Sequence, residues 1–262
     1  MSLQYTKWIG KQRYHFAEID STNKKAKELA ATGATHGTLI TADTQTAGVG
    51  RRGRSWSSEN ETGIYMSLIL RPKLKPDKAS MLTLVAALAV VKAVTELLKI
   101  EQSETTLQIK WPNDIVINGK KICGILTEMI LNQNQMDAVV IGIGVNVANQ
   151  SFSEELADIA TSLYLETGVK LDREQLINRV WEQFELYYAV VMEKGDLRDC
   201  KVEYESFLAN KDEKVKILDP IGAYTGIAKG ITNTGELLVD TGTKIEQVAS
   251  GEVSVRGIYG YV

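Results

Sequence analysis

The residues best suited to chemistry lie in one loop, residues 44–58, whose sequence is TQTAGVGRRGRSWSS. The loop holds three glycines and three arginines and no acidic residue. Glycine lets the backbone approach a ligand, and arginine binds phosphate or carboxylate through two parallel hydrogen bonds. Arg51, Arg52 and Arg54 therefore predict an anion site. We expect the empty loop to be mobile, because like charges repel, and to become ordered around an anion.

The loop alone does not identify its ligand. Its pattern is neither the Walker phosphate loop nor the dinucleotide fingerprint. A solvated basic loop, or a contact with nucleic acid, accounts for the arginines equally well. The formal net charge of the chain is −3, so any basic site must be local.

A second cluster is the KWPND segment at residues 110–114. Asn113 and Asp114, at a turn beside strands, are suited to orienting a metal–phosphate group. Both residue types also favour turns on their own account, which is the simpler reading of the pair in isolation. Lys121 opens the strand after the Asn118-Gly119 hairpin turn. A lone lysine at a strand end is usually only solvated, so its role depends on the other clusters.

Alternating strand and helix patterns position these clusters. Ser21-Thr22-Asn23 is a good helix N-terminus, and Asp172 with Gln175 resembles a capping box. Gly142 and Gly144 interrupt an apolar strand and are typical of close approach by a ligand. We expect strands at 12–20, 37–43, 63–70, 121–131 and 137–147, a strand–turn–strand at 107–118, and helices at 24–31, 78–99 and 172–195.

The chain changes character near residue 212, after which short strands and turns follow at close intervals. We predict a large domain at 1–211 and a small β-barrel at 212–262. The two cysteines, Cys123 and Cys200, are far apart and read as reduced thiols of a cytoplasmic protein. The start of the chain has no signal-peptide pattern, and the apolar run at 81–91 is too short to span a bilayer, so we expect a buried helix there and no membrane partner.

Taken together, the clusters resemble the biotin–protein ligase family. The matching segments follow the order of that family from about Phe16 to Arg256. They are STN at 21–23, Gln45, AGVGRRGRSW at 47–56, KWPND at 110–114, KICGIL at 121–126, IGIGVN at 141–146 and SGEVSVRG at 250–257. The Gly/Arg loop together with KWPND is highly specific, whereas each segment alone is weak.

The resemblance implies a biotin site. Its residues would be Ser21, Thr22, Asn23, Gln45, Gly48, Val49, Gly50, Arg51 and Lys121. The hydroxyl and amide groups suit the ureido ring of biotin, which offers N–H donors and a carbonyl acceptor. Val49 departs from the commonest pattern, in which this position is often basic, so only its backbone N–H can bind the carboxylate.

The resemblance also implies an ATP and adenylate site. Its residues would be Arg51, Arg54, Trp56, Asn113, Asp114, Gly142, Val145, Asn146 and Arg256, with Gly144 on the same strand. Asp114 would be near Mg²⁺. Lys121 and Arg51 would be catalytic, stabilising charge while the biotin carboxylate attacks the α-phosphate of ATP. The expected reaction makes biotinyl-5′-AMP and passes biotin to a lysine of a biotin carboxyl carrier protein.

The family fold implied is α+β: a mixed sheet with flanking helices, similar to class II aminoacyl-tRNA synthetases, followed by an SH3-like barrel. Only about fifteen residues precede the first matching strand, too few for a winged helix, so we expect the short form without direct DNA binding. A homodimer is also expected.

Three other functions stay open. A lipoate–protein ligase shares the fold and the acyl-adenylate chemistry. A non-catalytic biotin or biotinyl-AMP sensor would account for Val49, but not for the retention of Lys121, Asn113 and Asp114. A nucleic-acid-binding module fits poorly with the overall acidity.

Overall fold

A seven-stranded mixed sheet forms the centre of the computed structural model, which describes residues 6–58, 61–101, 105–133, 135–219, 222–251, 254–257 and 261–262. The strand order is β1-β2-β3-β7-β6-β5-β4. β1 and β2 are parallel, and the other neighbours are antiparallel. The elements are β1 (Arg13–Ile19), α1 (Thr22–Ala31), β2 (Leu39–Gln45), β3 (Gly63–Leu70), α2 (Met81–Ile100), β4 (Leu107–Lys110), β5 (Asp114–Ile117), β6 (Lys120–Asn132), β7 (Gln135–Asn146), α3 (Leu163–Thr167), α4 (Arg173–Lys194) and α5 (Lys201–Ser206). The predicted mixed sheet with helices is confirmed.

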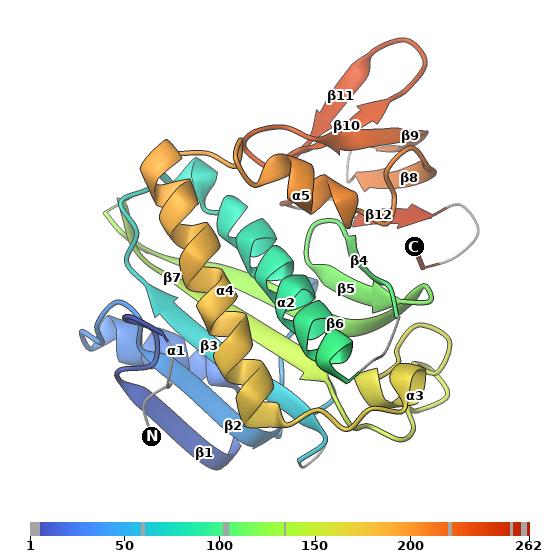
Figure 1. The fold of residues 1–262 in the computed structure, drawn as a ribbon. Helices are drawn as coiled ribbons and strands as arrows, with labels where there is room; N and C mark the ends of the chain where they lie inside the picture. Colours follow the sequence, from blue (N-terminus) through green and yellow to red (C-terminus); the bar gives the residue numbers. More distant parts are fainter. Residues whose placement is uncertain are drawn as a thin grey trace.

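Helices cover both faces of this sheet (Figure 1). α2 and α4 lie on one face, and α1 lies on the other, where Ala26 and Ala30 pack against Ile40, Ile69 and Val140. The strand residues alternate between the two faces, so the sheet buries apolar side chains on each side. Each face of the sheet is therefore covered at least in part by helices.

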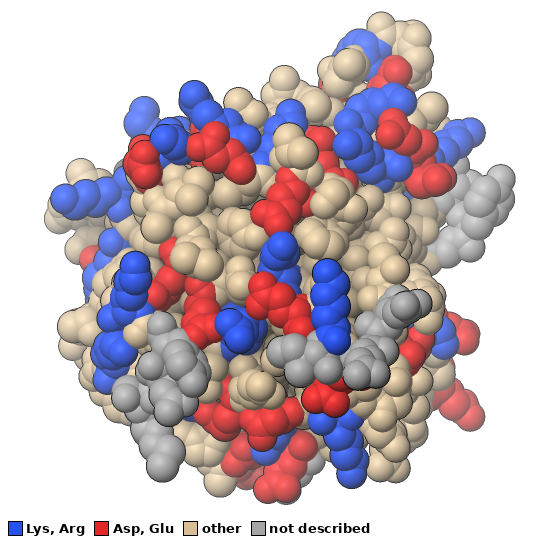
Figure 2. All heavy atoms as spheres, in the orientation of Figure 1, with Lys and Arg blue, Asp and Glu red and all other residues tan. Residues whose placement is uncertain are grey.

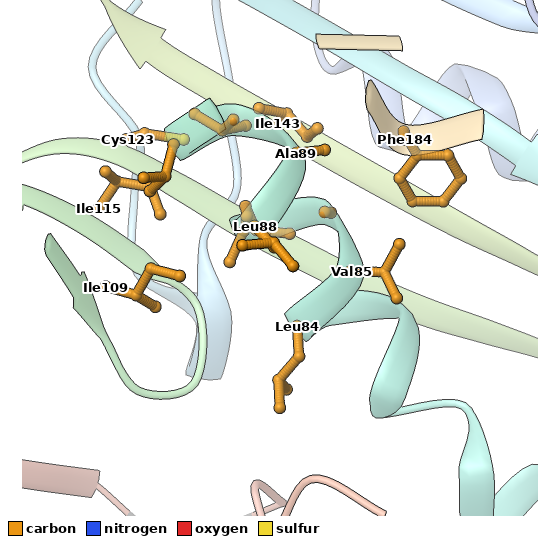
Figure 3. Close-up of a cluster of buried hydrophobic side chains, with 14 of the residues drawn as sticks. Leu84, Val85, Leu88, Ala89, Ile109, Ile115, Cys123, Ile143 and Phe184 are labelled. Carbon is orange, nitrogen blue, oxygen red and sulfur yellow. The ribbon is translucent and has the colours of Figure 1, made fainter. Parts of the chain in front are cut away.

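α2 is the central core helix. Leu84, Val85, Leu88 and Ala89 of α2 meet strand residues from the sheet and Phe184 of α4 (Figure 3). The segment Pro76–Lys99 is long and apolar enough to cross a membrane, but 83% of its apolar window is buried inside the fold. The predicted buried helix is confirmed. A short 3-10 turn, Pro76–Lys78, leads into it.

α4 begins and ends where the sequence predicts. The Asp172 side chain accepts a hydrogen bond from Gln175 N, and Gly195 ends the helix with φ 71°. Midway along α4, the buried carboxylate of Glu185 accepts hydrogen bonds from the backbone N–H groups of Lys7, Trp8 and Ile9. This carboxylate therefore fixes the segment that leads into β1.

A second sheet of five antiparallel strands lies beside β4 and β5 (Figure 1). Its order is β11-β10-β9-β8-β12, from β8 (Lys214–Asp219), β9 (Gly222–Ile231), β10 (Leu237–Asp240), β11 (Ile245–Val248) and β12 (Ser254–Gly257). The buried Trp111 donates from Nε1 to the Gly235 carbonyl, at 3.0 Å. The KWPND segment thus connects the two sheets.

Charged side chains of both signs are mixed over the face shown in Figure 2, which is the α2 and α4 face of Figure 1. The figure shows no extended basic patch on that face.

Candidate active site

The parallel pairing of β1 and β2 brings two predicted segments together. Ile19 at the end of β1 pairs with Gln45 at the end of β2, and α1 starts three residues after Ile19. Gln45 Oε1 accepts from Thr22 N at 2.8 Å and from Thr22 Oγ1 at 3.0 Å. Ser21 is the N-cap, and its side chain accepts from Lys24 N. The helix start therefore presents hydroxyl and amide groups in a fixed arrangement.

Asn23 is held by residues that the sequence analysis did not select. Its Oδ1 lies 2.6 Å from the buried Ser67 Oγ, and its Nδ2 donates to Glu128 Oε2 at 2.9 Å. Ser67 carries a hydroxyl group in β3, a strand whose eight residues are all buried. A buried polar group needs a partner, so a lone serine in the run GIYMSLIL was the available signal. No local sequence pattern indicated that Glu128 would contact Asn23.

The Gly/Arg loop folds back on itself. Gly50 N donates to Arg54 O at 2.7 Å, Trp56 N donates to Gly48 O at 2.9 Å, and Val49 bridges to Ser55. Arg52 has φ 59° and ψ 33°, a left-handed conformation at the turn. The loop therefore has a defined path in this structure; its mobility without ligand stays a prediction.

Trp56 lies over glycines of two neighbouring strands. A Cβ atom at Gly144 would come within 2.6 Å of its indole ring, and a Cβ at Gly124 within 2.8 Å. A Cβ at Gly142 would lie 2.0 Å from Asn23 Oδ1. The strand glycines thus make room for side chains of the protein itself, and all three also line the first of the two cavities described below.

Arg51 joins three segments of the chain. Its Nη1 donates to Asn113 Oδ1 at 3.0 Å, and its Nη2 donates to the carbonyls of Ser250 at 2.6 Å and Gly251 at 2.9 Å. Burial lowers the pKa of the Arg51 guanidinium, while the charge of Asp114 opposes that shift. A guanidinium remains charged at physiological pH even so. Arg51 is therefore a fixed positive charge at the meeting point of the loop, KWPND and the second sheet.

Lys121 lies beside the same meeting point. Its Nζ is 2.6 Å from Asp114 Oδ1 and 5.2 Å from the centroid of the Trp56 ring. The other carboxylate oxygen of Asp114 accepts a hydrogen bond from the Tyr261 hydroxyl. Asp114 is the carboxylate that holds the lysine in place here.

Lys110 and Tyr261 add a contact that the sequence analysis missed. Lys110 Nζ lies 3.2 Å from the centroid of the Tyr261 ring, a cation–π contact. Burial lowers the pKa of Lys110 to about 8, and the attraction of Asp114 opposes this shift. Burial also raises the pKa of the Tyr261 hydroxyl, so that group stays protonated. The two residues lie 151 positions apart by their numbers, and no sequence spacing links them.

Two cavities meet at these residues. The first encloses about 440 Å³ and is lined by Ser21, Thr22, Asn23, Gln45, Val49, Gly50, Arg51, Trp56, Asn113, Lys121, Gly124, Ile125, Leu126, Gly142, Ile143 and Gly144. The second encloses about 1140 Å³ and includes Arg54, Lys110, Asp114, Asn146, Arg256 and Tyr261 in its lining. Gly50, Arg51, Trp56, Asn113 and Lys121 line both.

Most of the predicted site residues line one of these cavities, but four differ from expectation. Gly142 and Gly144, expected beside the adenylate, line the first cavity with Asn23. Val145 lines neither, because alternation along β7 turns its side chain into the hydrophobic core. Gly48 also lines neither, and a Cβ there would lie 2.6 Å from the Trp56 carbonyl, so its role is to close the loop.

The donor set fits a phosphate-borne magnesium ion rather than a protein cage. Among the described residues, no group of three or more His, Cys, Asp or Glu side chains is placed to hold a metal. Mg²⁺ commonly needs only one or two protein carboxylates when phosphate oxygens and water complete its shell. Asp114, with the neighbouring Asn113, supplies oxygen donors of that kind in the second cavity.

The arrangement favours bringing two anions together. Arg51 and Lys121 stand at the boundary of the two cavities, and Lys110 adds a buried ammonium to the second, where Asp114 is the one carboxylate among the described lining residues. Cationic groups in a water-poor site stabilise charge that develops between them. A polar, hydroxyl- and amide-bearing pocket on one side and a larger cationic pocket on the other indicate a reaction that joins a small polar molecule to a phosphate.

Comparison with known proteins agrees with this chemistry. Residues 15–146 match the biotin/lipoate A/B protein ligase family, and residues 212–256 match the biotin protein ligase C-terminal domain. The bifunctional ligase/repressor BirA of Bacillus subtilis (strain 168) is 40% identical over 252 residues, which are 95% of this chain and 76% of BirA. The biotin–[acetyl-CoA-carboxylase] ligase of Mycobacterium tuberculosis is 33% identical over 241 residues, covering 90% of this chain and 86% of that protein.

A solved structure of biotin protein ligase from Aquifex aeolicus in complex with biotin and ATP has a TM-score of 0.82 and 34% sequence identity to this chain. The match covers 94% of this chain and 99% of the Aquifex protein. The fold, both halves of the sequence and the paired cavities lead to the same result: the chain belongs to the biotin protein ligase family.

Proposed function

We propose that this protein activates biotin with ATP to form biotinyl-5′-AMP, and then transfers biotin to a lysine of a biotin carboxyl carrier protein. The observation that carries the proposal is the shared wall of the two cavities, where Arg51 and Lys121 reach both. The first cavity takes biotin, because Ser21, Asn23 and Gln45 offer both donors and acceptors to a ureido ring. The second takes ATP.

In the first step, a carboxylate oxygen of biotin attacks the α-phosphorus. The new P–O bond forms as the bond to the β-phosphate oxygen breaks, and pyrophosphate leaves with the bonding electron pair. Negative charge on the phosphoryl oxygens is stabilised by Arg51 and Lys121. Both side chains already have partners, so the substrates must replace Asp114 at Lys121 and one or more oxygen partners at Arg51.

Magnesium belongs to the proposal as an ion that enters with ATP. When bound, it neutralises phosphate charge. Asp114 and Asn113 are the residues that would hold it, because both offer oxygen donors to the second cavity and Asp114 can turn from Lys121 towards a cation.

In the second step, the neutral amine of the acceptor lysine attacks the biotinyl carbonyl carbon. The N–C bond forms, the C–O bond to the phosphate breaks, and AMP leaves with the bonding pair. Two protons are released overall, one from the ammonium before attack and one from the nitrogen that becomes the amide. Until then, the Gly/Arg loop and Trp56 exclude water from the mixed anhydride.

Biotin-dependent exchange of labelled pyrophosphate into ATP tests the first step. We expect exchange with biotin and none without it. Lipoate in place of biotin separates the main alternative, since the match at residues 15–146 is to a family of both biotin and lipoate ligases. Exchange with lipoate and not with biotin would overturn the proposal. Binding of both ligands without any exchange would identify a sensor instead.

We also propose the finer points that the resemblance implied. The second sheet would be an SH3-like barrel and the large domain similar to class II aminoacyl-tRNA synthetases, supported by five short antiparallel strands and by the mixed sheet. The protein would be cytoplasmic, supported by two buried free cysteines. It would form a homodimer and not bind DNA directly, the latter supported by its net charge of −3. Sedimentation velocity and a DNA mobility shift at low salt check these last two points.

A further inference from the structure

A third cavity, here called the acceptor groove, reaches the same meeting point from another side. It encloses about 1020 Å³. Its walls come from the 3-10 turn before α2 (Asp77), from the N-cap and first turn of α2 (Ser80 and Thr83), from β6 (Thr127 and Met129) and from the turns of the second sheet, including Glu236. Arg51 and Asn113 line this groove and both of the other cavities. Neither step of the proposed reaction, as described above for the two cavities, involves the groove.

Arg51 forms the inner end of the acceptor groove. Its guanidinium extends from Asn113 to the carbonyls of Ser250 and Gly251, and all three partners line the groove. The side chain thus stands between the groove and the biotin cavity. When Arg51 turns to a phosphoryl oxygen, the hydrogen bonds to these carbonyls are given up and the inner end of the groove opens towards the acyl carbon.

The groove is suited to a long side chain with a cationic end. Asp77 and Glu236 place two carboxylates in its lining, while Arg51 is the one cation among the described residues that line it. Burial raises the pKa of Glu236, but hydrogen bonds from the Thr232 and Thr234 hydroxyls outweigh it and lower that pKa, so the carboxylate is charged. Further in, Thr83 Oγ1 donates to Thr127 Oγ1 at 2.8 Å and leaves a mostly uncharged passage.

When both substrates are bound, the acceptor groove remains as an unoccupied route to the acyl carbon of the adenylate. Biotin fills the first cavity and the nucleotide fills the second, so the acyl carbon lies where Arg51 and Lys121 meet. Arg51 also lines the acceptor groove, so the groove reaches the residue beside which the acyl carbon lies. An amine that came through the nucleotide cavity would meet AMP, the leaving group, before it met the acyl carbon.

We propose that the acceptor groove admits the lysine of the carrier protein, with Asp77 and Glu236 attracting its ammonium and Arg51 closing the inner end until its guanidinium turns to a phosphoryl oxygen of the bound nucleotide. This inference rests on the proposed function and concerns its second step. According to this proposal, Asp77 and Ser80 affect how the acceptor protein binds and do not take part in forming the adenylate.

Two variants test the groove, each with a matched control. Asp77→Lys reverses an exposed charge at the rim, and Asp199→Lys makes the same change at an exposed position that lines none of the cavities described above. Ser80→Trp fills the groove at a helix start where the serine makes no capping hydrogen bond. Ser206→Trp places the same bulk on the exposed end of α5.

Two readouts separate the steps. Pyrophosphate exchange, or trapping of the adenylate with hydroxylamine, reports adenylate formation, and transfer to a purified biotin carboxyl carrier domain reports the use of the groove. For Asp77→Lys, we expect normal exchange with a KM for the carrier domain raised about threefold at low salt. For Ser80→Trp, we expect normal exchange with transfer reduced by about tenfold or more. Both controls should behave as the unmodified protein.

The outcomes are distinguishable from failure of the proposed function. Absence of biotin-dependent exchange in the unmodified protein would overturn the function itself. Normal exchange in both variants, with unchanged kinetic constants for the carrier domain, would overturn the groove alone. If Ser80→Trp does not fold, its exchange activity falls as well, and Asp77→Lys then decides the question.

Discussion

At the scale of single residues, the site depends on charges that are already paired before any substrate arrives. Lys121 is held by Asp114, and Arg51 by Asn113 and two backbone carbonyls. These partners bind the two cations through oxygen atoms, and the substrate carboxylate and phosphate that replace them also bind through oxygen atoms. The unliganded site thus keeps its cations in position without burying an uncompensated charge, which would be costly.

Lys121→Ala removes one of the two charges at the boundary of the cavities. We expect biotin-dependent pyrophosphate exchange to fall by about 10² to 10³, the usual loss for one charge-stabilising donor. Biotin affinity, measured by titration calorimetry, should change far less, since the ureido ring binds elsewhere. Lys120→Ala is the matched control, because that amine bonds the Ala157 carbonyl outside the site. Exchange at the normal rate in Lys121→Ala would refute the role of the lysine.

Lys110 predicts a pH dependence of ATP binding. Its pKa is lowered by burial to about 8, so the ammonium is present below that pH and lost above it. Because the charged form favours phosphate, the KM for ATP should rise as the pH passes from about 7 to 9. Lys110→Arg keeps its charge across this range and should lack the rise. A KM for ATP that is flat with pH in the unmodified protein would show that Lys110 does not contact the phosphates.

At the scale of elements, a few anchors determine where the strands end and hence where the site lies. Glu185 on α4 binds three backbone N–H groups ahead of β1, and the Ser21 cap begins α1 directly after β1. The parallel β1–β2 pair then sets Gln45 beside Thr22. An error in the anchoring of β1 is therefore transmitted to the biotin cavity.

Glu185→Ala tests this anchor. Three backbone N–H groups lose a charged acceptor on a buried side chain, and we expect the free energy of unfolding to fall by about 2–4 kcal/mol. Urea denaturation followed by circular dichroism measures it, with Glu193→Ala at an exposed position of α4 as the control. The affinity for biotin should weaken as well. A loss below about 0.5 kcal/mol, typical of surface positions, would mean that the anchor is not needed.

At the scale of the whole molecule, local patterns predicted elements well and long-range contacts poorly. The buried helix, the cap at Asp172, the end at Gly195 and the hairpin at Asn118-Gly119 follow from residues a few positions apart. The contact of Arg51 with Ser250, and that of Lys110 with Tyr261, join residues more than a hundred positions apart. Only the folded chain brings these pairs together, so no spacing in the sequence reports them.

The resemblance to the family indicated which segments form the site. The direction of each side chain, in contrast, depends on the alternation of residues along the strands. Val145 belongs to a matching segment, yet strand alternation turns it into the core, whereas its neighbours Gly144 and Asn146 face the cavities. Ser67 and Glu128 lie outside every matching segment, but both hold Asn23.

Both substrates should stabilise the whole molecule together. Each binds only the folded chain, so a thousandfold excess over Kd adds about 4 kcal/mol to the free energy of unfolding. Because biotin and nucleotide share Arg51 and Lys121, we expect the Tm shift with biotin and a non-hydrolysable ATP analogue to differ from the sum of the separate shifts. Differential scanning calorimetry measures this. Strictly additive shifts would argue against a shared boundary.

The stacking of Trp56 on Gly124 and Gly144 limits how this protein can diverge. A methyl group at either glycine would lie less than 3.0 Å from the indole ring, so a substitution at either position requires the tryptophan to move. Related chains that accept alanine at one of these glycines should carry a smaller side chain in place of the tryptophan. We therefore expect the residues at positions 56, 124 and 144 to covary among related sequences.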